Sequence, residues 1–596
     1  MHVFKHGKWD LSELVKDPYS SAFSRRLHEI DLKVKSFQKN KKILGPKIFE
    51  KQFLSLLRSL EEITEKFSIL SGYASLEYST DTQSDKATAL LMKMRRFGSE
   101  IENRTLFFDQ WWKKEIDEKN AQRLMQSAGE LHEFLRYKRL LAKYSLTEPE
   151  EKIINTLDVT GHSALVKLYD RITNAFEFVV KIGGKTRKYN REELSQFIRS
   201  PKSITREMVY KALLSLYEKN KGVLGEIYQN IALNWKDECI QIRGYSSPIS
   251  VRNIGNDVDD KTVNSLLSVC KRNSEVFRRF FDQKARILNV KKLRRYDIYA
   301  PIQKKEEKKY GYDKAVRLVL QTLNNFDPKL GEFARMVFLE NHIASTVRPG
   351  KRRGAFCSTI TPKIIPYVFV NFKGKSNDVF TLAHELGHAV HSMAASGKSI
   401  FIQEAPLPLA ETASTFSEML LFDQILSQVS DEEKRSILVE HLDDLYSTIS
   451  RQAYFTVFEI TAHKKIGDGA TVQDITAEYM KTLQEQFGNS IVLSPDFGVE
   501  WTCIPHFYHS PFYCYSYSFG NLLALSMFQR YRREGRSFAP AYLEILSAGG
   551  SKKPEELLKD HGIDISSEAF WQEGFHYIRN QTKRKRRKSA TRKQRD

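Results

Sequence analysis

The sequence contains no long apolar run. A helix that crosses a membrane needs about 18 or more consecutive apolar residues, and no such stretch occurs among the 596 residues. Residues 1–10 include Lys5 and Lys8 and lack the apolar segment that a secretion signal requires. We therefore expect no membrane span and a protein that stays in the cytoplasm, where it is made.

Cysteine is also scarce. There are five, an odd number, and no two of them have the CxxC spacing of a metal or redox motif. This pattern argues against a disulfide framework and against a zinc ion bound by cysteines, and it is typical of proteins in a reducing compartment. The five are Cys239, Cys270, Cys357, Cys503 and Cys514.

Glycine and proline are few, 29 and 17 in the whole chain, and apolar residues recur at helical spacing through most of the sequence. Between residues 49 and 67, for example, apolar residues recur at steps of three and four, as on one face of a helix. The sequence therefore predicts a mainly α protein. Because the chain is too long for one hydrophobic core, we expect a helical domain over residues 1–200, a catalytic domain over 201–580 and a basic, disordered tail over 581–596.

That tail contributes much of the positive charge. The formal net charge is +21, and residues 582–596 carry nine Lys or Arg and one Asp, a net +8, which leaves +13 for the rest. Such a segment buries no apolar surface and can contact nucleic acid or anionic membrane in a salt-dependent way. No zinc finger, aromatic RNA-binding motif or Gly-rich phosphate loop accompanies it. A solvated tail is the simpler interpretation, so nucleic-acid contact is not expected to be the main function.

The residues that indicate chemistry begin at His384-Glu385-Leu386-Gly387-His388. Residues 378–393 have the pattern of an amphipathic helix that Asn377 or Asp378 can cap. On such a helix His384 and His388 lie one turn apart on the same face, where both imidazoles can reach one Zn²⁺. Glu385 is rotated about 100° from His384 and suits a general base. The alternative is a pair of surface histidines on a polar helix face.

A catalytic zinc site needs a third protein ligand and one open position. Downstream, Glu411 begins a second helix among small and apolar residues, where a buried carboxylate would need a partner such as a metal. Glu418 follows two turns later on the same face and can orient a ligand histidine. His391 fits a supporting or core position better than a ligand. The alternatives are an exposed carboxylate at a helix start for Glu411 and a surface acid for Glu418.

Two further segments have patterns that predict local structure. Residues 367–372 follow Pro366, are rich in β-branched and aromatic residues, and form the clearest predicted strand. Near the C-terminus Pro511 is expected to begin a helix that places Tyr513 and Tyr517 on one face. An aromatic core helix is the competing interpretation of the tyrosines.

With these motifs in view, the chain resembles the thimet-oligopeptidase family of zinc metallopeptidases, and within it the oligoendopeptidase F group. The similarity runs nearly end to end, although Cys514 stands where a tyrosine of the family is expected. The motifs that carry it, in order, are residues 9–14, 350–356, 366–372, 384–388, 409–414 and 504–508.

The resemblance implies a role for each of these residues. His384, His388 and Glu411 would hold one zinc ion and Glu385 would be the general base. His506 and Tyr517, with Tyr513 as a weaker choice, would stabilise the oxyanion. The fold implied is a helical, zincin-like clamshell with a deep central channel and a small β-sheet beside the helix of the two histidines. The strand in residues 367–372 would be the edge that pairs with the substrate backbone.

The expected function is that of a zinc-dependent oligoendopeptidase, which hydrolyses internal bonds of short unstructured peptides by Glu-assisted attack of zinc-bound water. One alternative is a zinc endopeptidase that acts on folded proteins. The other is an inactive protein on the same scaffold that binds peptides or nucleic acid. The sequence leaves the oligomeric state and the cleavage preference open.

Overall fold

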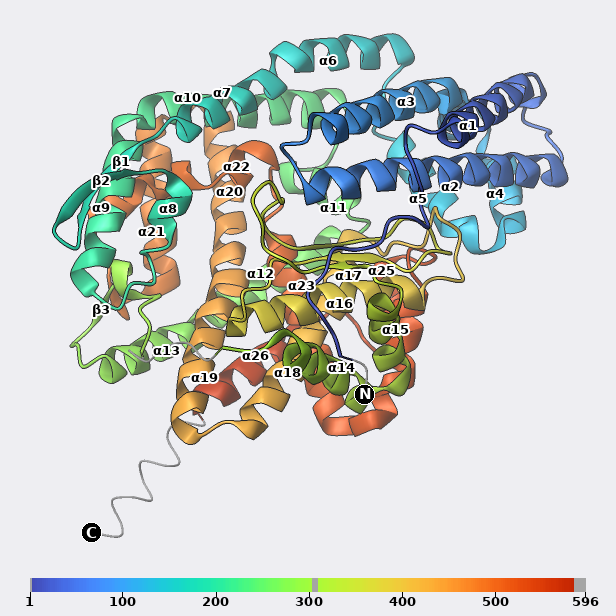
Figure 1. Ribbon diagram of the computed structural model, residues 1–596. Coiled ribbons are helices and arrows are strands. Elements are labelled where there is room, and N and C mark those ends of the chain that lie inside the picture. The colour runs from blue at the N-terminus through green and yellow to red at the C-terminus, as the bar shows by residue number, and fades with distance from the viewer. Residues whose placement is uncertain (1–2, 303–308, 584–596) are drawn as a thin grey trace. The chain divides into compact units, whose positions relative to one another are not determined.

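The computed structural model describes residues 3–302 and 309–583, and its architecture is mainly α, as predicted. Long helices dominate, and the strands are short (Figure 1). Contacts within the chain divide it into two compact units, each built from three separate stretches of sequence. In the portion that the structure describes, no helix has the length and apolarity needed to cross a membrane.

Unit 1 comprises Met1–Lys143, Glu307–Ser427 and Arg530–Ile563. Its elements are α1 (Ser21–Lys39), α2 (Glu50–Thr80), α3 (Asp85–Gln110), α4 (Glu118–Ser127), α5 (His132–Ala142), α14 (Tyr312–Phe326), α15 (Pro328–Leu339), β4 (Ile343–Ala344), β5 (Phe356–Ser358), β6 (Tyr367–Phe369), α16 (Ser376–Ala394), α17 (Leu407–Ala410), α18 (Thr412–Gln428), α24 (Ala539–Ser547) and α25 (Pro554–Asp560).

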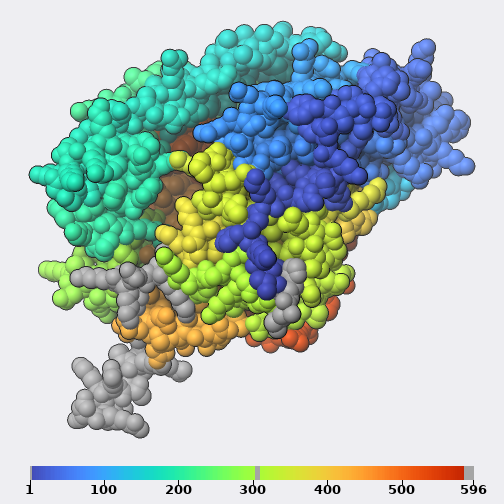
Figure 2. Space-filling model, viewed as in Figure 1, coloured from blue at the N-terminus to red at the C-terminus, as the bar shows by residue number. Residues whose placement is uncertain are grey.

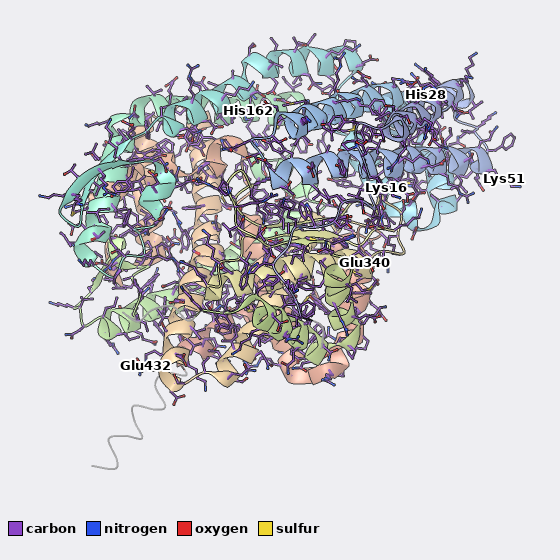
Figure 3. All side chains as sticks on the ribbon, viewed as in Figure 1. Lys16, His28, Lys51, His162, Glu340 and Glu432 are labelled. Carbon is purple, nitrogen blue, oxygen red and sulfur yellow. The ribbon has the colours of Figure 1, made fainter. Side chains whose placement is uncertain are left out.

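The first helices of unit 1 pack side by side around an apolar core, as the periodicity of residues 49–67 predicts. Side chains define where they begin: Ser20 caps α1 and Ser84 caps α3 by accepting hydrogen bonds from backbone N–H groups in the first turn. Charged residues cover the outer faces, where His28 and Lys51 are exposed (Figure 3). The core of this bundle includes the fully buried Trp112.

The N-terminal segment that precedes α1 lies across residues from the middle of the chain. Asp10 N–H donates to the carbonyl of Asn341, and Ser345 N–H donates to the carbonyl of Gly7. In Figure 2 this dark-blue segment runs over the yellow-green surface of unit 1. Trp9 on it packs against aromatic rings of the small sheet, including Tyr367, so the two distant stretches of sequence share one core.

That sheet has three strands in the order β4-β6-β5. Strand β6 pairs parallel with β4 and antiparallel with β5, with Cys357 opposite Val368. Both β5 and β6 pack against α16, which confirms the small sheet expected beside the helix of the two histidines. The predicted strand in residues 367–372 is therefore present, as β6 over Tyr367–Phe369, but it is the central strand.

Helix α16 begins two residues earlier than predicted. Lys375 occupies the N-cap position, and Asp378 lies in the first turn, where its Oδ2 accepts hydrogen bonds from the N–H groups of Lys373 and Lys375. The prediction that Asn377 or Asp378 is the cap was wrong. A carboxylate three residues into a helix can satisfy backbone donors that precede it, so the cap residue itself needs no side-chain acceptor here.

Unit 2 comprises Tyr144–Glu306, Gln428–Gln529 and Asp564–Asp596. Its elements are α6 (Glu148–Thr160), α7 (His162–Asn174), β1 (Phe178–Ile182), β2 (Lys185–Tyr189), α8 (Arg191–Ser195), α9 (Ser203–Lys219), α10 (Lys221–Trp235), α11 (Pro248–Gly255), α12 (Asp260–Arg272), α13 (Ser274–Ile287), β3 (Leu293–Arg294), α19 (Asp431–Leu445), α20 (Arg451–Gly467), α21 (Val472–Phe487), β7 (Ile491–Val492), α22 (His506–His509), most of α23 (Tyr515–Glu534) and α26 (Glu568–Lys583).

The core of unit 2 is crossed by the long, mostly buried helix α20, which packs against α10, α12 and α21. The expected division of the chain at residue 200 stays a prediction, as do the clamshell and its channel. Most of the basic tail expected over residues 581–596 lies outside the described residues.

Candidate metal centre

Helix α16 presents the two histidines together. The ring centroids of His384 and His388 are 4.9 Å apart, as expected for residues one turn apart on one face. Between them, Gly387 faces α18 at very short range. A Cβ atom added at Gly387 would lie 2.6 Å from the carbonyl oxygen of Ala413 and 2.6 Å from the Cα of Ser414. Glycine at this position therefore permits the close approach of α18, and our sequence analysis did not recognise this role.

Glu411 reaches the histidines from the junction between α17 and α18. Its Oε2 atom lies 3.4 Å from Nε2 of His384 and 3.5 Å from Nε2 of His388. The three ligand-type atoms lie within 4.8 Å of one another, the one such cluster among the described residues. Ser414 donates a hydrogen bond of 2.9 Å to the same Oε2 and fixes its position. The structure thus brings together the three residues that the sequence proposed as ligands.

The histidines and the carboxylates stabilise each other's charges. Burial lowers the pKa of His384, but hydrogen bonds to Glu411 and Glu418 outweigh it and raise that pKa well above its usual value. Burial raises the pKa of Glu411, whereas hydrogen bonds with His384 and His388 prevail and hold it far below its usual value. Nδ1 of His384 lies 2.5 Å from Oε1 of Glu418. The two carboxylates, Glu411 and Glu418, therefore make this side of the cluster favourable for positive charge.

Glu385 is mostly buried, with 7% of its surface exposed. Burial raises the pKa of its carboxyl group, and the neighbouring His384 and His388 act in the opposite direction. Its side chain lines the same pocket as the two histidines. A carboxylate in this position can accept a proton from a water molecule bound beside the histidines.

His391, one turn beyond His388, is also buried. Burial lowers the pKa of its ring to about 4 and the ring is therefore neutral at physiological pH, while a hydrogen bond with the backbone of Ala410 acts in the opposite direction. It does not belong to the three-donor cluster. Its hydrogen bond with Ala410 ties α16 to the segment that leads to Glu411, and a supporting role for His391 stays a prediction.

A pocket of about 430 Å³ opens over the cluster within unit 1. One wall is formed by β5 and the residues beside it, including Phe356 and Cys357, and another by Gln403 and Glu404. The resemblance implied that residues 367–372 form the sheet edge that faces substrate, and this was wrong. Strand β6 is flanked on both sides, so the edge beside the pocket belongs to β5.

The sequence did not identify Cys357 and Glu404 as residues that line the pocket. Glu404 lies in the connection between α16 and α17, between the histidines and Glu411 in the sequence, and that position was an available signal. Cys357 had none, because β5 is only three residues long and its place next to α16 follows from tertiary pairing. Burial raises the pKa of the Cys357 thiol well above its usual value, and Glu385 and Glu404 add to this effect.

The predicted oxyanion residues lie in unit 2 and form their own group. Nε2 of His506 is 3.2 Å from the hydroxyl of Tyr517, and the rings of Tyr513 and Tyr517 are 5.4 Å apart. Tyr515 points elsewhere, as expected, and its hydroxyl accepts a hydrogen bond from Asn256. Their role in catalysis stays a prediction.

Pro511 does not begin a helix, contrary to expectation. It lies between α22 and α23, and α23 starts only at Tyr515. The reason is visible in the next residue, Phe512, whose positive φ of 59° is incompatible with a right-handed helix.

The chemistry of the donor set, and its two separations from Glu411, suit a tetrahedral zinc ion. Bonds of about 2.0–2.1 Å at tetrahedral angles place neighbouring donor atoms about 3.3–3.4 Å apart, and the observed separations from Glu411 Oε2 to the two imidazole nitrogens are 3.4 and 3.5 Å. Two imidazoles with one carboxylate are a known ligand set for catalytic zinc. The residues present therefore suit this metal, although the same atoms accept other divalent ions.

Comparisons with known proteins relate the chain to a family of peptidases. Residues 196–577 match peptidase family M3. An oligoendopeptidase F homolog from Borreliella burgdorferi is 27% identical over 586 residues, 95% of each chain, and the chromosomal oligoendopeptidase F of Lactococcus lactis subsp. cremoris is 26% identical over 88% of each.

Solved structures show the same relationship. The crystal structure of a candidate peptidase from Chlamydophila abortus is 25% identical with a TM-score of 0.85 over 97% of each chain. An oligoendopeptidase-F from Enterococcus faecium, 21% identical, shares the fold with a TM-score of 0.69 over 94% of this chain and 98% of that one. The expected kinship with oligoendopeptidase F is confirmed, and the chain belongs to peptidase family M3.

Proposed function

We propose that the protein is a zinc-dependent oligoendopeptidase that hydrolyses internal bonds of short, unstructured peptides in the cytoplasm. The observation that carries this proposal is the convergence of His384, His388 and Glu411, in which Oε2 of Glu411 lies 3.4 and 3.5 Å from the two imidazole nitrogens. The names of the oligoendopeptidase F relatives support peptides as the substrate class. The cytoplasm suits a chain whose five cysteines are all unpaired.

In this proposal the three ligands hold zinc, and Glu418 orients the ring of His384. Bound there, zinc supplies Lewis-acid polarisation of the scissile carbonyl and acidifies water. Glu385 removes the proton from the attacking water and passes it to the amine that leaves. The buried setting of Glu385 keeps its carboxylate close to the histidine pair and away from bulk solvent.

The side chains of unit 2 are assigned a supporting role. His506 and Tyr517, already hydrogen-bonded to each other, are proposed to donate hydrogen bonds to the oxygen that becomes negative as the water attacks. Donors that are fixed before the reaction stabilise that charge by several kcal/mol, because they need no reorganisation. Tyr513 packs against both rings and is the weaker choice.

In this proposal the substrate backbone pairs with β5. This strand lies at the sheet edge and lines the pocket above the histidines. Main-chain pairing along an edge strand does not depend on side-chain identity, so broad sequence tolerance is expected.

The experiment is hydrolysis of a series of internally quenched peptides of increasing length, with and without a chelator. The proposal predicts cutting of short peptides, loss of cutting with the chelator, recovery with zinc, and a sharp decline above a modest length. Equal degradation of a folded protein substrate would favour an endopeptidase without a length limit. Cutting that the chelator leaves unchanged would refute the metal-dependent mechanism.

A further inference from the structure

The chain between α22 and α23 turns through a strained residue. The non-glycine residues with positive φ among the described residues are Asp257, Asn289, Asn341 and Phe512. Asp and Asn tolerate this left-handed conformation, whereas a bulky aromatic residue does not. The Phe512 side chain is moreover fully buried. Such a conformation persists only where the surroundings hold it in place.

Two residues hold the peptide bond that precedes Phe512, one at each end. The N–H of Phe512 donates to Oε1 of Glu459 at 3.0 Å, and the carbonyl of Pro511 accepts from Nε of Arg252 at 3.2 Å. Glu459 lies on α20 and Arg252 on α11. The ring of His463, one turn beyond Glu459, packs 4.6 Å from the ring of Phe512. The turn at Pro511 and Phe512, the corner between α22 and α23, is thus fixed by groups from two separate helices.

Glu459 is an unusual residue to find there. Its side chain is fully buried, and within the described residues its Oε2 atom has no hydrogen-bond partner. Burial raises the pKa of its carboxyl group to about 8, against the effects of the Phe512 N–H and of Arg252. A half-satisfied buried acid is a poor contributor to stability, because an apolar residue of similar size is often at least as stable. A role other than stability is therefore indicated.

The corner carries the group of side chains assigned to the oxyanion. Tyr513 follows Phe512 directly, and its ring stacks on that of His506 with an interplanar angle of 13°. The rings of Tyr513 and Tyr517 are 5.4 Å apart, and the hydroxyl of Tyr517 lies 3.2 Å from Nε2 of His506. The geometry of this group therefore depends on the direction in which the chain leaves Phe512.

We propose that Glu459 and Arg252 are positioning residues, which clamp the Pro511–Phe512 peptide and thereby hold Tyr513 and Tyr517 in the orientation that hydrolysis requires. This inference rests on the proposed function, because it assigns the tyrosines a part in the reaction. The clamp acts through one peptide bond and the start of α23.

The test compares two substitutions of nearly equal size at residue 459. Glu459→Gln keeps a carbonyl oxygen that accepts the Phe512 N–H, whereas Glu459→Leu removes the acceptor. With the zinc-loaded enzyme, Glu459→Leu should lower kcat about 10- to 100-fold, as small misplacements of reacting groups do. KM should change little, and Glu459→Gln should restore kcat to near that of the unmodified protein. A purely structural role predicts a lower melting temperature with unchanged kcat.

Arg252→Met removes the other end of the clamp and serves as the second variant. Because Arg252 is only half-buried, this variant is expected to fold even if Glu459→Leu does not. It should lower kcat with little change in KM. A folded Glu459→Leu or Arg252→Met protein with unchanged kcat overturns the inference.

A double-mutant cycle with Tyr517→Phe and Tyr513→Phe separates this inference from the proposed function. If the clamp acts through the tyrosines, Glu459→Leu lowers kcat much less in the background that lacks both hydroxyls than in the unmodified protein. Fully multiplicative losses contradict it. If Glu385→Gln is inactive while the double tyrosine variant keeps full activity, the clamp has nothing to position, and the inference fails while the zinc peptidase stands. If chelator and Glu385→Gln leave hydrolysis intact, the proposed function itself fails.

Discussion

Nδ1 of His384 lies 2.5 Å from Oε1 of Glu418, and Nε2 of the same ring lies 3.4 Å from Oε2 of Glu411. One imidazole therefore joins two carboxylates that stand seven residues apart. A hydrogen bond from Nδ1 to Glu418 leaves Nε2 as the nitrogen that can bind a metal. The packing of α18 beside α16 thus brings the two carboxylates to opposite nitrogens of the His384 ring.

This arrangement predicts that Glu418 controls metal affinity. Glu418→Ala should weaken zinc binding about 10- to 100-fold, the usual loss when the partner of a ligand histidine is removed. Glu404→Ala is the matched control, because Glu404 lines the same pocket without contacting either histidine in a hydrogen bond or ion pair that the structure describes. Competition with a chromogenic chelator measures both affinities. Equal affinities for the two variants would contradict the assigned role.

Glu385 is expected to act on the proton and not on the metal. Glu385→Gln should keep one zinc ion per chain and lose nearly all turnover, at least the 10²- to 10⁴-fold that a general base contributes. Steady-state hydrolysis of a quenched peptide, together with metal analysis of the same sample, provides the measurement. A variant that retains near-normal kcat would remove Glu385 from the mechanism.

Gly387 is expected to be needed for the approach of α18. An alanine Cβ there would lie 2.6 Å from the backbone of Ala413 and of Ser414, so Gly387→Ala should push α18 away and separate Glu411 and Glu418 from the histidines. We predict a lower melting temperature and weaker zinc binding. Gly222→Ala is the control, because Gly222 also lies in a helix, α10, with nothing within 4 Å of the added Cβ. It should be neutral or slightly stabilising.

The stability of unit 2 should depend on pH through Asp297. Burial raises the pKa of this carboxyl group, but hydrogen bonds from Arg294 and Arg206, at 2.8 and 2.7 Å, prevail and lower it. Because the folded pKa lies below the unfolded value, this stabilisation is complete above the unfolded pKa of about 3.9 and is lost as pH falls through the folded pKa.

Asp297→Asn should therefore lower the free energy of unfolding at pH 7 by about 1–3 kcal/mol. The difference from the unmodified protein should shrink as the pH falls below 4. Denaturant unfolding at several pH values, followed by tryptophan fluorescence, measures both quantities. A difference that stays constant down to pH 3 would show that the charge of Asp297 does not contribute.

The sequence was sufficient where local periodicity carries the information. The helix expected over residues 378–393 is α16, Ser376–Ala394, because apolar positions at helical spacing and the two histidines at one-turn spacing define its faces. The pairing of Glu411 with the histidines was expected from its setting among small and apolar residues together with the family resemblance.

Features that depend on tertiary contacts were not predictable in the same way. Strand β6 was recognised, but its place between β4 and β5 depends on pairing with two strands of two and three residues, too short to leave a pattern. The helix expected at Pro511 fails because Phe512 adopts a left-handed conformation that only its contacts with Glu459 and the surrounding core can maintain. The importance of Gly387 likewise appears only when α18 is in place.

The central claim is that His384, His388 and Glu411 together hold one zinc ion. Elemental analysis of the purified protein, beside His388→Ala and Glu411→Ala, tests it most directly. We predict one zinc per chain in the unmodified protein and in Glu404→Ala, and much less than one in the two ligand variants after equal dialysis. Stoichiometric zinc retained by Glu411→Ala with unchanged affinity would contradict the account.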